Sequence, residues 1–161
     1  MHPTTTRTGA RILLLEGDPA ERARYSAWLA TAGYDVVAAG SLAEAGAALA
    51  NGCFDLAIAD LDPARSNGLG LLITLRADRL GLRLLAISRG SFLATAHALG
   101  AAGTLRKPFE RTCLLGAAAA ALADHASGPG GRPSSGQFDL GFAPARPSLL
   151  REGGSLRLAA A

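Results

Sequence analysis

The chain has 161 residues, a length that suits one compact domain with a tail and argues against two full-size domains. Its sixteen basic residues outnumber its thirteen acidic ones, so the formal net charge is +3. The excess lies at the two ends, since residues 11–124 carry eleven basic and eleven acidic groups. Direct nucleic-acid binding by this chain is therefore not expected, because it needs a basic surface.

Features of membrane and secreted proteins are absent from the sequence pattern. The longest mostly apolar run, residues 114–123, is far shorter than the roughly 20 residues that span a bilayer. No secretory signal is readable before the first apolar stretch. Cys53 and Cys113 belong to no metal or redox motif, which favours reduced, buried thiols. We expect a cytoplasmic protein with no membrane association.

From residue 11 onward, short continuous apolar runs alternate with longer segments of helical periodicity. Continuous runs are typical of parallel strands that helices cover on both faces. The predicted strands are Ile12–Leu15, Asp35–Ala38, Asp55–Ala59, Leu82–Ile87 and Gly103–Arg106. The alternation predicts an α/β domain with a doubly wound, five-stranded parallel sheet.

Five helices are predicted between and after these strands. Asp18 precedes Pro19 and stands three positions before Glu21, a pattern that predicts a helix capped by Asp18. Ser41, with Glu44, repeats the capping pattern before the second helix. The other three helices are predicted at Leu69–Arg79, Phe92–Leu99 and Phe109–Ala123.

The ends of the chain differ in composition from the domain predicted at residues 11–124. Residues 1–10 are expected to be disordered, and residues 125–137 form a linker rich in Gly, Pro and Ser. Residues 138–161 form a tail in which two short β-type segments flank Gly153-Gly154. This pattern is compatible with a β-hairpin or with a disordered tail.

Polar side chains stand at or just after the ends of four predicted strands. They are Glu16, Asp60, Ser88 and Lys107, which is the single lysine of the chain. Because ligands bind at the carboxyl ends of parallel strands, these groups are expected to meet in one site. Small unreactive residues follow the second strand, which predicts an edge strand away from the site.

The chemistry of this group favours phosphoryl transfer to an aspartate. A cluster of carboxylates suits a hard divalent cation such as Mg²⁺, with the lysine adding a further positive charge. In such a site the carboxylate attacks, the metal and lysine neutralise the phosphoryl oxygens, and the hydroxyl donates to one of them. Asp60 is the predicted nucleophile because it ends the central strand.

Four segments in register, RILLLEGDP, DLAIADLDPARSNGLGLL, LLAIS and GAAGTLRKPF, resemble the receiver domain of bacterial two-component response regulators. The resemblance covers residues 11–124 and implies a CheY-like signalling module rather than an enzyme. It implies that Asp60 is the phosphoacceptor, that Lys107 and Ser88 stabilise the phosphoryl group, and that the Lys107-Pro108 peptide is cis. A sensor histidine kinase or phosphotransfer protein is the implied partner, and a homodimer would use the face of the fourth helix, fifth strand and fifth helix.

Departures from the family pattern affect the predicted metal site. Gly17 stands where the family has a direct metal ligand, which argues against Mg²⁺ binding. The remaining candidate ligands are Glu16, Asp60 and Asp62. Asp18 is either a further ligand or only a helix cap. Asp62 is likewise either a ligand or simply an acid of the loop.

Two further departures affect signalling. Thr104 stands at the switch position, where the family commonly has an aromatic residue. Arg89 replaces a small residue after Ser88, and it is expected either to be solvated or to pair with Asp62.

Two functions therefore remain open. One is phosphoryl acceptance from a sensor kinase on Asp60 within a phosphorelay. The other is a pseudo-receiver, a phosphorylation-independent interaction module in which Asp60 and Lys107 form a structural ion pair; Gly17 and Thr104 favour it. A small flavodoxin-like enzyme has less support, because no nucleotide or flavin loop is present. The tail also resembles the first strands of a winged-helix effector domain, without the helices that would enter DNA.

Overall fold

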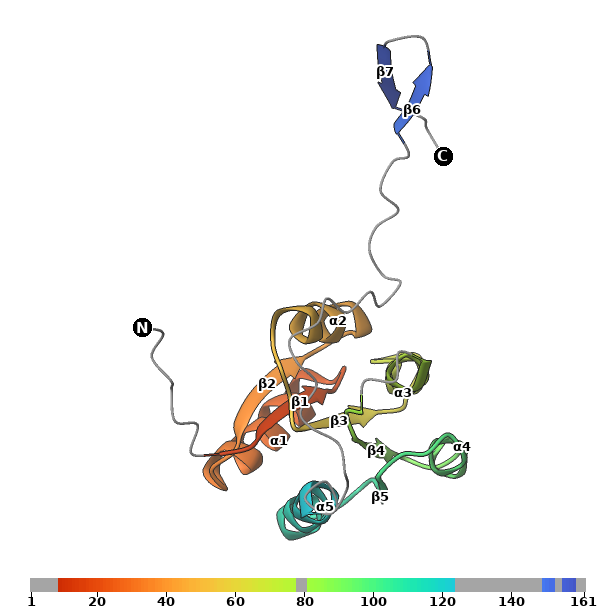
Figure 1. Ribbon diagram of the computed structural model, residues 1–161. Helices are drawn as coiled ribbons and strands as arrows, with labels where there is room; N and C mark the ends of the chain where they lie inside the picture. The colour runs from red at the N-terminus through yellow and green to blue at the C-terminus, as the bar shows by residue number, and fades with distance from the viewer. Residues whose placement is uncertain (1–8, 78–80, 124–148, 153–154, 159–161) are drawn as a thin grey trace, which may run out of the picture.

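The computed structural model describes residues 9–77, 81–123, 149–152 and 155–158. Five parallel strands alternate with five helices through the first two of these ranges (Figure 1). The strands are β1 (Arg11–Leu15), β2 (Asp35–Ala39), β3 (Leu56–Asp60), β4 (Leu84–Ser88) and β5 (Gly103–Arg106). The helices are α1 (Pro19–Thr31), α2 (Leu42–Asn51), α3 (Gly68–Ala77), α4 (Leu93–Ala98) and α5 (Arg111–Ala123).

The strand order is β2-β1-β3-β4-β5, and all neighbouring strands pair in parallel. Strand β3 is therefore central and β2 lies at an edge, as predicted. The direction of winding reverses between β1 and β3, which is where open α/β sheets bind ligands. The predicted fold class, a doubly wound five-stranded parallel sheet, is confirmed.

Helices cover both faces of the sheet because side chains alternate along each strand. In β1, Ile12 and Leu14 pack on the side of α1 and α5, whereas Leu13 and Leu15 pack on the side of α2, α3 and α4. Every residue of β3 and β4 is buried. This explains why the strands appear in the sequence as continuous apolar runs.

The predicted helix caps are present. Asp18 Oδ1 accepts hydrogen bonds from the N–H groups of Ala20 and Glu21, at 2.9 and 3.0 Å. Ser41 Oγ accepts from the Glu44 N–H at 3.2 Å. These caps place the starts of α1 and α2 at the carboxyl edge of the sheet.

Both cysteines are exposed and they do not form a disulfide with each other. The prediction of buried thiols is wrong. In α5 the buried position of the first turn belongs to Leu114, and Cys113 beside it faces outward.

In the tail, β6 (Leu149–Glu152) and β7 (Ser155–Leu158) pair antiparallel, and Glu152 lies opposite Ser155. They occupy the two β-type segments on either side of Gly153-Gly154. The N-terminal segment 1–8, the linker 125–137 and residues 138–148 lie outside the described residues. Among the residues that the structure does describe, no helix has the length and apolar character to cross a membrane.

Candidate functional site

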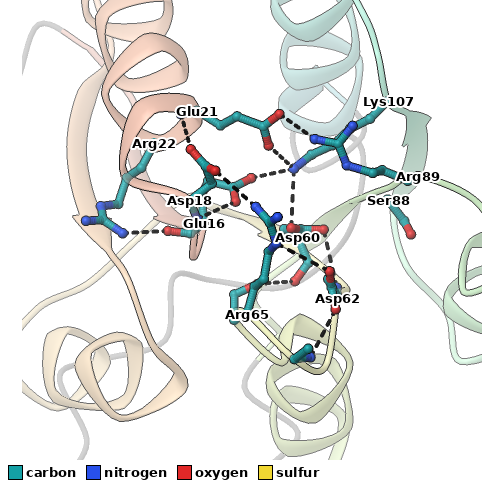
Figure 2. Close-up of polar contacts among 12 residues, drawn as sticks. Glu16, Asp18, Glu21, Arg22, Asp60, Asp62, Arg65, Ser88, Arg89 and Lys107 are labelled. Carbon is teal, nitrogen blue, oxygen red and sulfur yellow. Dashed lines mark hydrogen bonds and ion pairs between the residues drawn. The ribbon is translucent and has the colours of Figure 1, made fainter.

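Four polar side chains from different strands are buried together at the carboxyl edge of the sheet (Figure 2). Glu16 follows β1, Asp60 ends β3, Ser88 ends β4 and Lys107 follows β5. None of the four residues is more than 5% exposed. The Lys107 N–H donates to the Ser88 carbonyl oxygen at 2.8 Å, which ties the ends of β4 and β5 together. The structure thus brings together the four residues that stand at strand ends in the sequence.

The ammonium group of Lys107 is bound by three carboxylates. Nζ lies 2.7 Å from Glu16 Oε2, 2.6 Å from Glu21 Oε2 and 3.2 Å from Asp60 Oδ2. The side chains of Lys107 and Glu16 are only 2% and 0% exposed, so water screens these ion pairs weakly. An ammonium group has three donors, and each carboxylate can therefore accept one.

Glu21 is a site residue that was predicted only as part of a helix start. It lies in the first turn of α1, and its side chain turns toward Lys107 (Figure 2). A usable signal was present in the sequence. Because α1 follows β1 directly, an acid in the first turn of this helix stands at the same sheet edge as Glu16.

Burial and ion pairing shift the pKa values of two groups. Burial raises the pKa of Glu16 above its ordinary 4.5, although hydrogen bonds from Lys107 and the Asp18 N–H oppose the change. Burial by itself lowers the pKa of Lys107, but hydrogen bonds to Glu16 and Glu21 and the charge of Asp60 outweigh it and raise the pKa. Lys107 is therefore an ammonium ion throughout the physiological pH range.

An aromatic wall lies beside the ammonium group. Lys107 Nζ is 5.7 Å from the centre of the Tyr25 ring, within the range of a cation–π contact. The Phe109 ring packs on Tyr25 with 5.0 Å between ring centres. Tyr25 is 2% exposed, and burial raises the pKa of its phenol above 10. This apolar surface keeps water away from the ion pairs, which strengthens them.

A second ionic group is centred on Arg65, in the loop between β3 and α3. Its Nη1 lies 3.0 Å from Asp18 Oδ2, and its Nε lies 3.7 Å from Asp62 Oδ2. Hydrogen bonds from the N–H groups of Glu21 and Ala20, together with Arg65, hold the pKa of Asp18 below its usual 3.8. Asp18 is thus a helix cap, as its sequence context predicts, and also an ion-pair partner.

The hydrogen-bond donors around the acids predicted as magnesium ligands show how far their oxygens are already engaged. Glu16 Oε1 accepts from the Asp18 N–H at 3.0 Å, and Oε2 accepts from Lys107. Asp60 Oδ1 accepts from the Asp62 N–H at 3.3 Å, and Oδ2 accepts from Lys107. Both oxygens of each of the two buried acids therefore already have a donor.

The same holds for the two more exposed acids. Asp18 uses one oxygen to cap α1 and the other to bind Arg65. Asp62 Oδ1 accepts from the Ala64 N–H at 3.0 Å, and Oδ2 faces Arg65. In the described part of the chain, no three His, Cys, Asp or Glu residues are placed to hold a metal ion. In this arrangement the donor set does not fit Mg²⁺, which needs several oxygen ligands turned toward one point.

Arg89 pairs with Glu21 rather than with Asp62. Its Nη2 lies 2.8 Å from Glu21 Oε1, and its side chain is 65% exposed. Of the two alternatives for Arg89, the pairing with Asp62 is wrong, because Arg65, three residues along the same loop as Asp62, faces that acid. The exposed side chain agrees with the other alternative, a solvated cation, although Arg89 also pairs with Glu21.

Two residues with predicted signalling roles differ in their exposure. Ser88 is 4% exposed, and its Oγ accepts a long hydrogen bond of 3.4 Å from the Gly90 N–H. Thr104 is exposed on β5. The Lys107-Pro108 peptide is cis, as the resemblance implies.

Comparison with known proteins identifies a family model, a curated relative and several solved structures that are similar to this chain. The family model described as the response regulator receiver domain matches residues 12–119. The DNA-binding transcriptional regulator NtrC of Rhizobium meliloti (strain 1021) is 35% identical over 130 residues, covering 79% of this chain and 26% of that protein. The chain therefore spans about a quarter of the length of this curated relative.

Solved structures agree with the family model. NtrX from Brucella abortus in complex with ADP is 25% identical with a TM-score of 0.68, over 74% of this chain and 28% of that one. The chemotaxis response regulator CheY4 of Vibrio cholerae is 27% identical with a TM-score of 0.61, over 71% of this chain and all of that one. A CheY-like receiver domain from Methanospirillum hungatei JF-1, 24% identical with a TM-score of 0.68 over 74% of this chain and 98% of that one, shows the same fold.

The family match covers most of the chain, from β1 into α5, and includes all four buried strand-end residues. It ends before the tail, so the resemblance of residues 138–161 to a winged-helix domain stays a prediction. Receiver domains are signalling modules that interact with sensor kinases or phosphotransfer proteins. The chain belongs to the response regulator receiver domain family of two-component systems.

Proposed function

We propose that Asp60 accepts a phosphoryl group from a sensor histidine kinase or a phosphotransfer protein. The observation that supports this most is the position of Asp60. It ends the central strand, it is 3% exposed, and its Oδ2 lies 3.2 Å from the ammonium group of Lys107. Ser88 ends β4, the strand next to β3, so its hydroxyl stands at the same edge of the sheet.

In the proposed reaction, a carboxylate oxygen of Asp60 attacks the phosphorus of a phosphohistidine. The new O–P bond forms as the N–P bond breaks, and the imidazole nitrogen leaves with the electron pair. Lys107 holds Oδ2, which leaves Oδ1, with its single long hydrogen bond from Asp62, as the attacking atom. Lys107 then neutralises the charge of the phosphoryl oxygens, and the Ser88 hydroxyl donates a hydrogen bond to one of them.

The geometry argues against a purely structural pair between Asp60 and Lys107. Of the three carboxylates on Lys107, Glu16 and Glu21 make the short contacts, and Asp60 makes the long one. Two acids other than Asp60 thus already make the shortest ion pairs with the buried ammonium group. In a pseudo-receiver with a purely structural Lys107, Glu16 and Glu21 would form the main ion pairs, so that role does not explain an aspartate at position 60.

The test is phosphorylation of the whole chain by acetyl phosphate or phosphoramidate, followed by intact-mass measurement. We expect one phosphoryl adduct on the wild type and none on Asp60→Asn, which preserves the shape of the side chain. Parallel samples contain Mg²⁺ or EDTA, so that metal dependence does not hide the reaction. A wild type without adduct in both samples, or an adduct that persists in Asp60→Asn, would contradict the proposal.

We propose three further properties: a surface for dimerisation and switching, a cytoplasmic location, and no direct binding of nucleic acid. The face formed by α4, β5 and α5, which carries the exposed Thr104, is the proposed homodimer surface and switch region. A cytoplasmic location follows from the proposed kinase partner, and the balanced charge of residues 11–124 supports a chain that does not itself bind nucleic acid. Light scattering of the wild type and of Thr104→Arg checks the dimer surface, because an added charge at a self-contact separates the copies.

A further inference from the structure

Receiver domains generally bind Mg²⁺ at the phosphorylation site. In this chain the place of one ligand side chain, that of residue 17, is taken up by protein atoms. A Cβ atom at Gly17 would lie 2.7 Å from both the carbonyl carbon and the carbonyl oxygen of Arg65, and 2.8 Å from Arg65 Cβ. The main chain of the β3–α3 loop therefore lies directly against position 17. No side chain, and so no ligand, fits there without movement of that loop.

The same loop also places a positively charged side chain, that of Arg65, at this edge of the sheet. The guanidinium group of Arg65 lies between Asp18, in the loop after β1, and Asp62, in the loop after β3 (Figure 2). These two loops lie on either side of the switch point between β1 and β3. A guanidinium group carries a fixed charge and a planar set of donors that suits carboxylate and phosphoryl oxygens. Arg65 thus has the charge and the donors that a bridging cation would supply.

Each carboxylate at this sheet edge also contacts a side-chain cation of the same chain. Five carboxylates gather there, those of Glu16, Asp18, Glu21, Asp60 and Asp62. Four side-chain cations contact these five carboxylates. Lys107 binds three of them and Arg65 binds the other two. Arg89 and Arg24 lie 2.8 and 3.8 Å from Glu21, which Lys107 also binds. A divalent ion would have to compete with these cations for the same carboxylate oxygens.

We propose that Arg65 takes the place of the divalent cation in this receiver domain and excludes Mg²⁺ from the strand-end site. A consequence rests on the proposed function: a phosphoryl group on Asp60 is neutralised by Lys107 and Arg65, and phosphorylation proceeds without Mg²⁺. The exclusion of Mg²⁺ does not rest on phosphorylation and is testable by binding alone.

The binding test is calorimetric titration of Mg²⁺ into the whole chain. Wild type is expected to show no binding at millimolar Mg²⁺. Arg65→Ala frees oxygens of Asp18 and Asp62 and is expected to bind Mg²⁺ at least about tenfold more tightly than the wild type, whereas Arg65→Lys keeps the charge and stays closer to the wild type. Arg111→Ala is the matched control, because it removes an exposed arginine from the start of α5 and leaves the site unchanged.

Two calorimetric results would overturn the proposal. One is submillimolar Mg²⁺ binding by the wild type, which would support the ligand set of Glu16, Asp60 and Asp62. The other is an Arg65→Ala chain that binds no more tightly than Arg111→Ala. Circular dichroism of each variant verifies that it is folded; the Arg65 side chain is 47% exposed, so its replacement leaves the core in place.

A second experiment measures the rate at which acetyl phosphate phosphorylates the chain, once in EDTA and once in Mg²⁺. The expected wild-type rates agree within about twofold, and Arg65→Ala in EDTA is expected to be about tenfold slower, with recovery in Mg²⁺. A wild-type rate that rises about tenfold or more with Mg²⁺ overturns the proposed role of Arg65. Failure of labelling in every sample contradicts the proposed function instead, and the calorimetric result then decides the metal question independently.

Discussion

The main chain of Arg65 packs against the Cα atom of Gly17, so that an added Cβ at Gly17 would come within 2.7 Å of the Arg65 carbonyl group. This contact joins the loops that follow β1 and β3, the two strands between which the winding reverses. Backbone atoms cannot turn aside as a flexible side chain can. Glycine at position 17 is therefore a packing requirement of this chain, and the absent acid is its consequence.

Gly17→Ala is expected to lower the free energy of unfolding by about 1–3 kcal/mol, the usual cost of forcing an extra carbon into a packed region. Gly17→Asp carries the same clash and a further charge beside Asp18, so restoring the family's acid should not restore a metal site. Urea denaturation measures both. Gly116→Ala is the control, because Gly116 lies within α5 and an added Cβ there meets no atom within 4 Å. This variant should raise the free energy of unfolding by about 0.5–1 kcal/mol. Equal effects at the two positions would refute the packing argument.

Replacing Lys107 tests the buried ion pairs. Lys107→Met removes the cation from three carboxylates and is expected to cost about 3–5 kcal/mol at neutral pH, because buried charges are left uncompensated. Arg89→Ala removes a cation from the same cluster, but its side chain is 65% exposed, so we expect a loss below about 1 kcal/mol. Urea denaturation of both variants provides the comparison. Similar losses would mean that burial does not set the strength of these pairs.

Titration of the Tyr25 phenol is expected to make the free energy of unfolding depend on pH in the alkaline range. Burial raises the pKa of its phenol above 10, so the folded chain holds this proton to a higher pH than the unfolded chain. Between these two pKa values the folded state binds more protons, and stability falls as the pH rises above about 10. The raised pKa of Lys107 contributes a fall of the same sign.

Tyr25→Phe removes the phenol contribution and leaves that of Lys107. Its urea midpoint is expected to fall less steeply than that of the wild type as the pH rises from about 9 to 11. Tyr34→Phe retains Tyr25 and should follow the wild-type slope. If both variants match the wild type, the phenol of Tyr25 has no raised pKa.

Ser88 is expected to act on the phosphoryl group rather than on stability. Among the residues that the structure describes, its hydroxyl accepts only a long hydrogen bond, from the Gly90 N–H. Ser88→Ala should therefore change the free energy of unfolding by less than about 1 kcal/mol. The same variant should lower the steady-state phosphoryl adduct on Asp60 about tenfold, because a hydrogen bond to a charged group is lost. Ser88→Thr keeps a hydroxyl and should retain the adduct. Intact-mass measurement decides, and an unchanged adduct on Ser88→Ala would exclude the proposed role.

Much of the fold follows from local patterns. The apolar runs of β1, β3 and β4 and the caps Asp18 and Ser41 predict the elements to within one or two residues at most ends. The rule that parallel strands bind ligands at their carboxyl ends then places Glu16, Asp60, Ser88 and Lys107 together. These predictions succeed because periodicity, capping and strand direction are properties of neighbouring residues.

The partners of each charge depend on distances between loops that are far apart in the sequence. Nothing near Glu21 or Arg89 in the sequence indicates that they meet, 68 positions apart. The contact of Gly17 with Arg65 depends on how closely the loop after β3 approaches the loop after β1, which is set by the packing of whole strands and helices. Local patterns therefore predict the fold and an acidic site that contains the lysine. The cations that pair with each acid follow from the packing of distant loops, because an ion pair depends on distances of a few ångströms that local patterns do not encode.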